Sequence, residues 1–422
     1  MRKPYNWKDG PDVIQEHSIA KHNILRSYLT AYFKTLACSP KQDHLRITLV
    51  DGFAGGGLYT HHQTQEIIKG SPFICLDAVK EAEYHLNIDK KKPFKIEANY
   101  FFVEKDKYAQ QHLEHALKEG GYSNQLGNEI ILRHCKFDET ATDIIDFIKK
   151  KSPRNGRSIF ILDQYGYKEV PTSLISRIFQ KLPSAEVILT FGIDSFLNYA
   201  SDSALSAKLL NDVGIPDILE GRSFEQIKTS ERDWRLFIQS ALYRELVSKC
   251  GAKHFTPFFI RNRKGHGDYW LIHLSQHHRA RDVMTQVHWQ NHNNFIHYGG
   301  AGINMFNILG YDPKYTEMFS NTNQNKLGFE FDEDARELSV ETLMEQIPKV
   351  VYAHDTGVSF GELFATTCNH SPASAMIYRQ AIENLVKHKE VEVISIDGAS
   401  KGTAQQIKDS DQIMPPSQRT LF

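Results

Sequence analysis

The sequence has little cysteine and no long apolar run. Five cysteines occur in 422 residues, and no two of them form a C-x-x-C pair. Scattered thiols in an odd number are typical of reduced cysteines in a cytosolic protein, not of a disulfide scaffold. No apolar stretch approaches the length of a membrane span, and the N-terminus lacks the apolar region of a signal peptide. The sequence therefore predicts a soluble, cytoplasmic protein without membrane contact.

The net charge is also small, at −1, because 50 Lys and Arg residues stand against 51 Asp and Glu residues. Any nucleic-acid binding would therefore depend on local basic patches. Histidines occur in pairs and at short spacings, as at His61-His62, but no cysteine or carboxylate accompanies them at ligand spacing, so no metal site is expected. A G-x-S-x-G nucleophile elbow is absent as well.

Two common phosphate-binding motifs are missing. No G-x-x-x-x-G-K-[ST] occurs, which excludes a P-loop. The glycine-rich stretch Asp51–Tyr59 would need a glycine at position 60 to be a dinucleotide fingerprint, but the chain has Thr60. The next acidic strand end, Glu104, lies far beyond the roughly 20 residues that the fingerprint requires. A cofactor without phosphate remains.

What is present is a regular alternation of strand-like and helix-like segments. A helix over residues 13–37 is followed by five short apolar runs that alternate with helical patterns up to residue 191. This alternation predicts a doubly wound parallel α/β sheet. Two further strands, Phe255–Ile260 and Tyr269–Leu274, are separated by a short polar segment and predict a β-hairpin. Five βα units closed by a hairpin make up the Rossmann-like architecture of class I methyltransferases.

Three regions are expected along the chain. Residues 1–300 form the methyltransferase-like domain, with a helical insertion at about 200–250, and residues 301–334 form a linker or irregular segment. Residues 335–422 show three helical patterns followed by the strand Val391–Ile396 and a turn, which resembles a winged helix. This last domain carries six Lys and Arg against seven Asp and Glu from residue 359 onward, so it fits a protein partner as well as DNA.

The glycine-rich stretch predicts the cofactor site. It follows the strand-like run Leu45–Val50, so a strand opens into a turn whose backbone N–H groups can approach a ligand. S-adenosylmethionine has the required shape and carries no phosphate. We expect Gly55 and Gly57 to admit its methionine end, and Glu104 to accept hydrogen bonds from its ribose hydroxyls. A tight turn without a ligand is the alternative.

Two more strand ends carry candidate residues. Asp138, after the third strand, is positioned to face the adenine ring, although it could instead cap the helix Thr140–Lys150. Asp163 and Tyr165 follow the fourth strand, where methyltransferases of exocyclic amines carry an Asp/Asn-Pro-Pro-aromatic tetrad. There Asp163 would accept from the amine and Tyr165 would stack on a flipped base. A capping carboxylate and a packed tyrosine are the alternative.

The order of these motifs resembles the three-Cys-motif partner proteins (TcmP) over roughly residues 15–300. The resemblance implies a methyltransferase-like fold, adds Asp51 and Phe53 to the cofactor-binding candidates, and implies a partner protein with a three-cysteine motif. Gln164 and Gly56 stand where the family usually has proline. The motifs are Asp51-Gly-Phe-Ala-Gly, Gly70-Ser-Pro72, Phe102-Val-Glu-Lys-Asp106, Leu162-Asp-Gln-Tyr-Gly-Tyr167 and Glu186-Val-Ile-Leu-Thr-Phe191.

A second resemblance concerns the first helix. His17-x-x-x-Lys21-His22 is similar to the lysine-histidine pair of ribosomal-RNA adenine-N6 methyltransferases, where that helix lies over the cofactor. His17 and Lys21 are four residues apart and share one helical face. Lys21 is therefore a cofactor-binding candidate, and a solvated face is the alternative.

Basic residues fall at both edges of the expected sheet. Arg261, Arg263 and Lys264 lie in the hairpin tip at the active edge and are the nucleic-acid-binding candidates, with a polar turn as the alternative. The lysine-rich stretches 90–92 and 149–151, with Arg154 and Arg157, precede strands and are interpreted as solvated surface at the opposite edge.

The sequence thus predicts an S-adenosylmethionine-dependent methyltransferase acting on a nucleic-acid base, with adenine N6 favoured. The alternative is a non-catalytic partner protein that binds a nucleoside or S-adenosylmethionine and docks another protein through its winged helix, in a phage-defence or mobile-element system. The terminal Gln418–Phe422 resembles a sliding-clamp peptide, a match that short segments often produce by chance.

Overall fold

The structure is a computed structural model that divides the chain into two compact units. The first unit is Met1–Glu225 with Arg244–Val287, and the second is Gln226–Tyr243 with His288–Phe422. The residues that the structure describes are 5–8, 10–37, 43–88, 93–164, 168–192, 196–197, 201–216, 218–219, 221–230, 234–260, 269–291, 301–303, 331–354 and 356–416.

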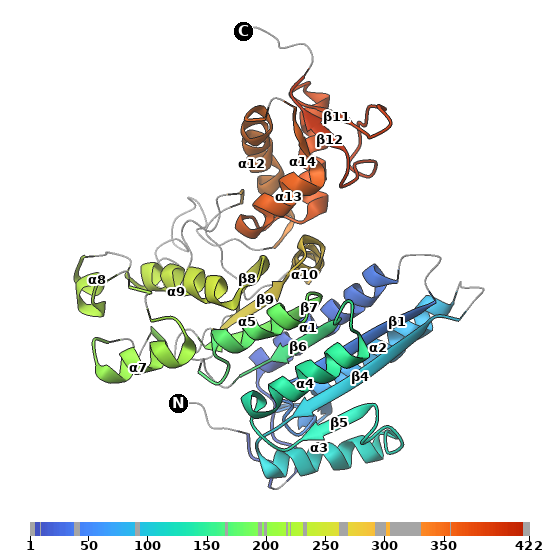
Figure 1. Cartoon of the computed structure of the whole chain (residues 1–422), viewed down its shortest axis with the longest axis vertical. Helices are drawn as coiled ribbons and strands as arrows, with labels where there is room; N and C mark the ends of the chain where they lie inside the picture. Colours follow the sequence, from blue (N-terminus) through green and yellow to red (C-terminus); the bar gives the residue numbers. More distant parts are fainter. Residues whose placement is uncertain are drawn as a thin grey trace. The chain divides into compact units, whose positions relative to one another are not determined.

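A seven-stranded sheet forms the centre of the first unit (Figure 1). Its strand order is β5-β4-β1-β6-β7-β9-β8; the pairings among the first five are parallel, while β9 runs antiparallel to both β7 and β8. The predicted doubly wound sheet closed by a hairpin is therefore confirmed. The strands are β1 (His44–Asp51), β4 (Lys95–Val103), β5 (Ile130–Arg133), β6 (Ser158–Leu162), β7 (Ala185–Gly192), β8 (His254–Ile260) and β9 (Tyr269–Ser275).

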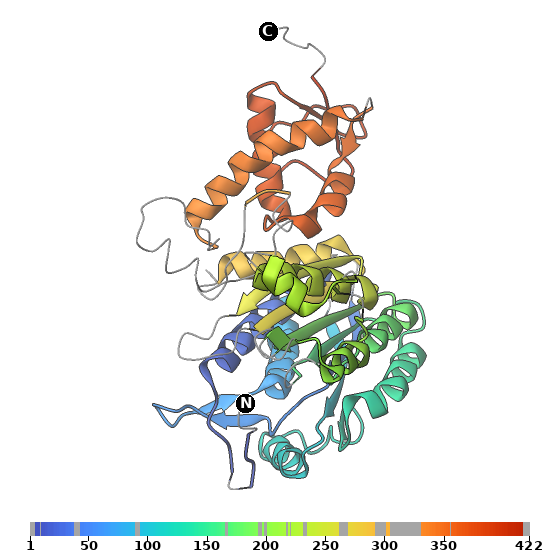
Figure 2. The same ribbon diagram turned by 90° about the vertical axis from the view of Figure 1, so that its left-hand side faces the viewer.

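Helices cover both faces of this sheet, and Figure 2 shows α1 and α2 on one side with α4 and α5 on the other. Every residue of β6 and β7 is buried, because both faces of these central strands are covered, and most of their side chains are apolar. The helices are α1 (Glu16–Leu36), α2 (Ser71–Asn87), α3 (Lys107–Glu119), α4 (Phe137–Lys151), α5 (Thr172–Lys181) and α10 (His278–Gln290). In the region of the expected insertion lie α7 (Ala204–Val213), α8 (Phe224–Ser230) and α9 (Trp234–Cys250).

A small hairpin between the glycine turn and α2 was not predicted. It consists of β2 (Leu58–Thr60) and β3 (Ile67–Lys69), which pair antiparallel. The N-cap of α2 is Gly70, and Pro72 lies in the first turn of the helix. Three-residue strands have too few alternating positions to give a sequence signal.

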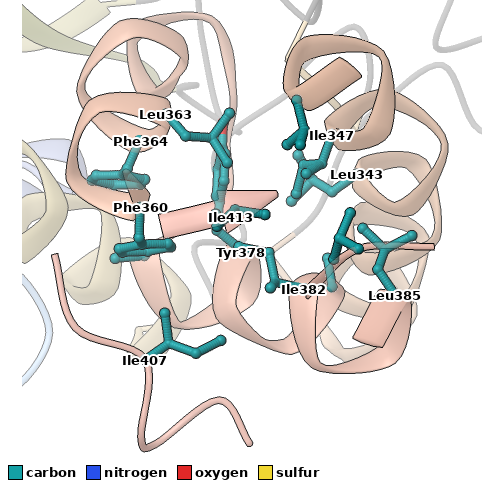
Figure 3. Packing of buried hydrophobic residues seen from close by; sticks show 14 of the residues in the cluster. Leu343, Ile347, Phe360, Leu363, Phe364, Tyr378, Ile382, Leu385, Ile407 and Ile413 are labelled. Carbon is teal, nitrogen blue, oxygen red and sulfur yellow. The ribbon is translucent and has the colours of Figure 1, made fainter. Parts of the chain in front are cut away.

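From residue 331 onward, the described part of the second unit contains three α-helices and a three-stranded antiparallel sheet of order β10-β12-β11. Apolar side chains from all three helices and from β12 meet in one core, which includes Leu343, Phe364, Tyr378 and Ile413 (Figure 3). Helices followed by short strands match the expected winged-helix pattern. The elements are α12 (Glu333–Tyr352), β10 (Val358–Ser359), α13 (Phe360–Thr367), the 3-10 turn η2 (Cys368–His370), α14 (Ala375–Lys387), β11 (Glu392–Ile394) and β12 (Gln412–Met414).

Among the described residues, no helix has both the length and the apolar character needed to cross a membrane. Most of the expected linker at 301–334 lies outside the described part of the chain, and the domain boundaries stay a prediction.

Candidate functional site at the carboxyl edge of the sheet

The glycine turn after β1 is shaped by backbone conformation and by close packing. Gly55 and Gly57 have φ angles of +58° and +78°, in the left-handed region that favours glycine. At Gly56 the reason is different, since a Cβ there would come within 2.2 Å of the Trp7 ring. Trp7 is buried, and its indole lies on the turn, so the N-terminal segment holds the turn in place.

Glu104 directly follows β4 and reaches back to this turn. Its carboxylate accepts hydrogen bonds from the backbone N–H groups of Gly55 and Asp106, each at 2.8 Å. Burial raises the pKa of Glu104, and these two backbone hydrogen bonds partly oppose that rise. The carboxylate is thus held at the end of β4 beside the glycine turn.

A cavity of about 380 Å³ lies beside Glu104. Its wall includes Phe53 from the glycine turn, Glu104, and Phe137 and Asp138 from the start of α4. Three loops that follow β1, β4 and β5 therefore border the same space. Asp138 lies in the first turn of α4, whose N-cap is Lys136, so Asp138 is not the capping residue that the alternative required.

Lys21 and Asp163 form an ion pair between α1 and the end of β6. His17 and Lys21 are only 5% and 8% exposed, so the alternative of a solvated face is wrong. Burial by itself would raise the pKa of Asp163, but the positive charge and hydrogen bond of Lys21, with a hydrogen bond from Thr190, lower it overall. Asp163 is therefore ionised at neutral pH. The N-cap of α5 is Pro171, so Asp163 does not cap that helix.

Asp51, the last residue of β1, is only 1% exposed and accepts a hydrogen bond from the Phe53 N–H at 3.1 Å. Burial raises its pKa to about 7, and the negative charges of Asp163 and Glu104 add to the rise. Three carboxylates thus lie within electrostatic range of one another at this edge of the sheet, with Lys21 as the cation paired to one of them.

Gln164 takes a structural role in the loop after β6. Its side-chain oxygen accepts hydrogen bonds from the backbone N–H groups of Glu169 and Val170, at 2.8 and 3.1 Å. The side chain is only 3% exposed. These bonds restrict the loop by a different means from proline, which restricts it through its ring.

Several predicted residues cannot be located. Tyr165, Arg261, Arg263, Lys264 and the segment Gln418–Phe422 lie outside the described residues. In the part of the chain that is described, no group of three or more His, Cys, Asp or Glu side chains is arranged to hold a metal ion. Sequence reasoning missed Trp7 and Phe137, because their contacts with the turn and the cavity depend on tertiary packing.

Comparisons with known proteins agree with this two-part architecture. A family model described as GMT-like wHTH domain matches residues 310–398, a range that includes α12, α13, α14 and β11. No curated protein matches the chain.

Three solved structures are examples of those that align weakly with the chain. A protein from Legionella pneumophila str. Philadelphia 1 aligns with a TM-score of 0.33 and 10% identity, over 60% of this chain and 84% of that chain. The bifunctional kinase-methyltransferase WbdD aligns at 0.32 and 9%, over 61% of this chain and 39% of that chain. M. jannaschii TYW2 in complex with AdoMet aligns at 0.27 and 11%, over 62% and 76%. These TM-scores are low, so the strand order and directions are the basis for describing the first unit as methyltransferase-like.

Proposed function

We propose that the chain binds S-adenosylmethionine in the cavity beside Glu104. The observation that carries this proposal is that Phe53, Glu104, Phe137 and Asp138 border one cavity at the carboxyl edge of a parallel sheet, where such folds bind nucleoside ligands. Glu104 offers carboxylate oxygens to ribose hydroxyls, and Phe137 and Asp138 offer a ring face and an acceptor to adenine.

The methionine end is assigned to the region of Gly55, Gly57, Asp51 and Lys21. Bound S-adenosylmethionine supplies a methyl group on a sulfonium centre. The buried Asp51 carboxyl can lose its proton beside a cationic ammonium group, because a nearby positive charge favours the ionised form. The left-handed glycines leave the turn free of side chains at two positions.

The proposed substrate is an exocyclic amine of a nucleic-acid base, with adenine N6 favoured. Asp163 is ionised, and a carboxylate has room for about four hydrogen bonds, so it can accept from the amine while it stays paired with Lys21. Its negative charge also stabilises the positive charge that develops on the amine nitrogen during attack. Tyr165 is assigned the stacking role, and Arg261, Arg263 and Lys264 the contacts to phosphates.

Membership of the TcmP family is part of this proposal, on the strength of the motif order described above. A partner protein with a three-cysteine motif, a cytoplasmic location and a sliding-clamp contact through Gln418–Phe422 belong to the same proposal.

Calorimetry with S-adenosylmethionine, followed by transfer of a labelled methyl group to DNA and to RNA, tests the function. We expect binding to the wild-type chain and label in one of the two polymers. Replacement of Asp163 by alanine should abolish transfer and leave cofactor binding nearly unchanged. Activity that survives this replacement would remove Asp163 from the mechanism.

A second candidate function is a non-catalytic module that binds the nucleoside and docks a partner protein. Polar residues of α14 favour it, because they are paired within the second unit: Arg379 with Asp409, and Glu383 with Lys387. A helix that recognises DNA would need unpaired polar and charged side chains to contact bases and phosphates. Cofactor binding without transfer to any polymer would support this module.

A further inference from the structure

A second cavity, of about 310 Å³, lies at the opposite edge of the sheet in the first unit. Arg157, which precedes β6, and Ala185, which begins β7, mark this edge as the one where the parallel strands start. Glu104 and Asp163 follow the ends of parallel strands, so the two cavities are at opposite edges. The size fits a small molecule.

The wall of this second cavity is rich in cationic side chains and hydrogen-bond donors. Arg157, His277 and Arg279 all line it. Arg157 is partly buried, and its guanidinium has no hydrogen bond or ion pair with any residue in the described part of the chain. His277 accepts a hydrogen bond from the Arg279 backbone N–H through Nδ1 at 3.1 Å, which leaves Nε2 as the donor of the neutral ring.

Tyr32 adds a buried donor to the same wall. It is 5% exposed, it lines the cavity, and its hydroxyl makes no hydrogen bond within the described ranges of the chain. Burial, together with the charge of Glu186, raises the pKa of Tyr32, so the hydroxyl keeps its proton at neutral pH. The hydroxyl oxygen is not itself enclosed by protein, so it can donate a hydrogen bond to a ligand in the cavity.

Among the described residues of this wall, Glu186 is the single carboxylate, and its side chain is hydrogen-bonded to the protein interior. Its side chain is 9% exposed, and one oxygen lies 2.9 Å from Nε2 of His273 and also accepts from the Tyr28 hydroxyl. Tyr28 Oη and His273 Nε2 are 3.1 Å apart, so the three side chains form one closed cluster. Glu186 is thus anchored to the protein interior.

The surroundings are electropositive as well. Burial is the main cause that lowers the pKa of His254 to about 4, and the neighbouring side chains of His278, Arg281, His277 and Lys253 contribute to the same shift. Such a field favours an anion in the adjacent cavity.

We propose that this second cavity binds a phosphomonoester, in which the phosphate lies among Arg157, Arg279, His277 and Tyr32. Guanidinium groups pair with phosphate oxygens through two parallel hydrogen bonds, and a phosphomonoester offers three acceptor oxygens at one end. Leu36 and Val283 provide an apolar part of the wall for a small organic body. The phosphate can belong to a free sugar phosphate or to the 5′ end of a nucleic-acid strand, and the experiment separates these sources.

Calorimetry on the full chain tests the proposal with four probes: inorganic phosphate, ribose 5-phosphate, and one oligonucleotide with either a 5′-phosphate or a 5′-hydroxyl. We expect the dissociation constant of a phosphomonoester probe to rise at least about tenfold in Arg157→Gln, and about threefold to tenfold in Tyr32→Phe. Arg154→Gln, at an exposed arginine three residues earlier, should leave it within about twofold.

The probes also distinguish a free sugar phosphate from a nucleic-acid strand end, and the variants distinguish this cavity from the one beside Glu104. Binding of ribose 5-phosphate supports a free sugar phosphate, and preference for the 5′-phosphorylated strand supports a strand end. The proposal is overturned if no phosphate-bearing probe binds, if Arg157→Gln binds as well as wild type while its thermal unfolding is unchanged, or if acetate binds as tightly as phosphate. It is also overturned if Glu104→Gln, at the other cavity, weakens the probes to the same degree.

Discussion

The carboxyl edge of the sheet and the α14 surface of the second unit use their charged groups in different ways. At the sheet edge, Asp51 and Lys21 are at least nine-tenths buried, and Glu104 lines a cavity. On α14, by contrast, Arg379 and Glu383 are paired with residues of their own unit. Buried charge is costly and is retained where it serves a ligand or a reaction. This difference supports the proposal that the chemistry occurs at the sheet edge and that the second unit has a docking or supporting role.

The largest effect should come from Asp163→Asn, which keeps the shape and removes the charge. We expect methyl transfer to fall by about 10² to 10⁴-fold, because the amine loses its anionic acceptor. The affinity for S-adenosylmethionine, measured by calorimetry, should change little. Asp146→Asn, an exposed residue of α4, is the matched control and should retain full transfer. Equal losses of methyl transfer in both variants would contradict a specific role for Asp163 at the sheet edge.

Asp51 predicts a dependence of stability on pH. Its pKa is about 7 in the folded protein and 3.8 as an ordinary carboxyl, so the folded state holds the proton more tightly. The contribution of Asp51 to the free energy of unfolding is fully present below pH 3.8 and is lost as the pH rises toward 7. The free energy of unfolding changes by about 4 kcal/mol at most over this range. Relative to wild type, Asp51→Asn should therefore gain stability between pH 5 and pH 8.

Chemical unfolding of both proteins at pH 5 and pH 8, followed by circular dichroism, measures this difference. A stability difference that stays constant between the two pH values would show that Asp51 is already ionised in the folded protein.

Glu104→Gln tests whether the carboxylate at the sheet edge contributes to cofactor binding. Loss of the charge should weaken the affinity for S-adenosylmethionine by about 10 to 100-fold, since hydrogen bonds to a charged group contribute about 1.5 to 3 kcal/mol. Glu114→Gln on α3, where Glu114 pairs with Lys118 at the surface, is the control and should bind like wild type. An unchanged dissociation constant in Glu104→Gln would separate Glu104 from the ribose.

The smallest effect is expected from Arg379→Gln in the second unit. It removes an ion pair with Asp409 and a cation–π contact with Phe360, which together contribute about 1 kcal/mol in this partly exposed setting. Hydrogen exchange should increase within residues 356–416 and stay unchanged in the first unit, while Lys408→Gln changes neither. A loss of cofactor affinity in Arg379→Gln would contradict the division of roles.

The sheet could be predicted from the sequence because buried parallel strands leave continuous apolar runs, as in β6 and β7. Glu104 could be assigned to the site because it directly follows such a run. The ion pair of Lys21 with Asp163 could not be derived from spacing, since 142 residues separate the two. Trp7 on Gly56 is a contact of the same kind.

For Arg157, the sequence prediction of a solvated position was wrong. Its position before a strand predicted solvated surface, but α1 and α10 approach the same edge and turn it into the wall of a cavity. The position of a residue before or after a parallel strand predicts the edge of the sheet at which it lies. Its solvent exposure there depends on neighbouring elements that sequence periodicity does not identify.

A crystal structure with S-adenosylhomocysteine tests the central claim most directly. The account predicts the ribose hydroxyls within hydrogen-bonding distance of the Glu104 carboxylate, and the adenine ring beside Phe137 and Asp138. A ligand bound elsewhere on the chain, with Glu104 bonded only to the backbone of Gly55 and Asp106, would contradict it.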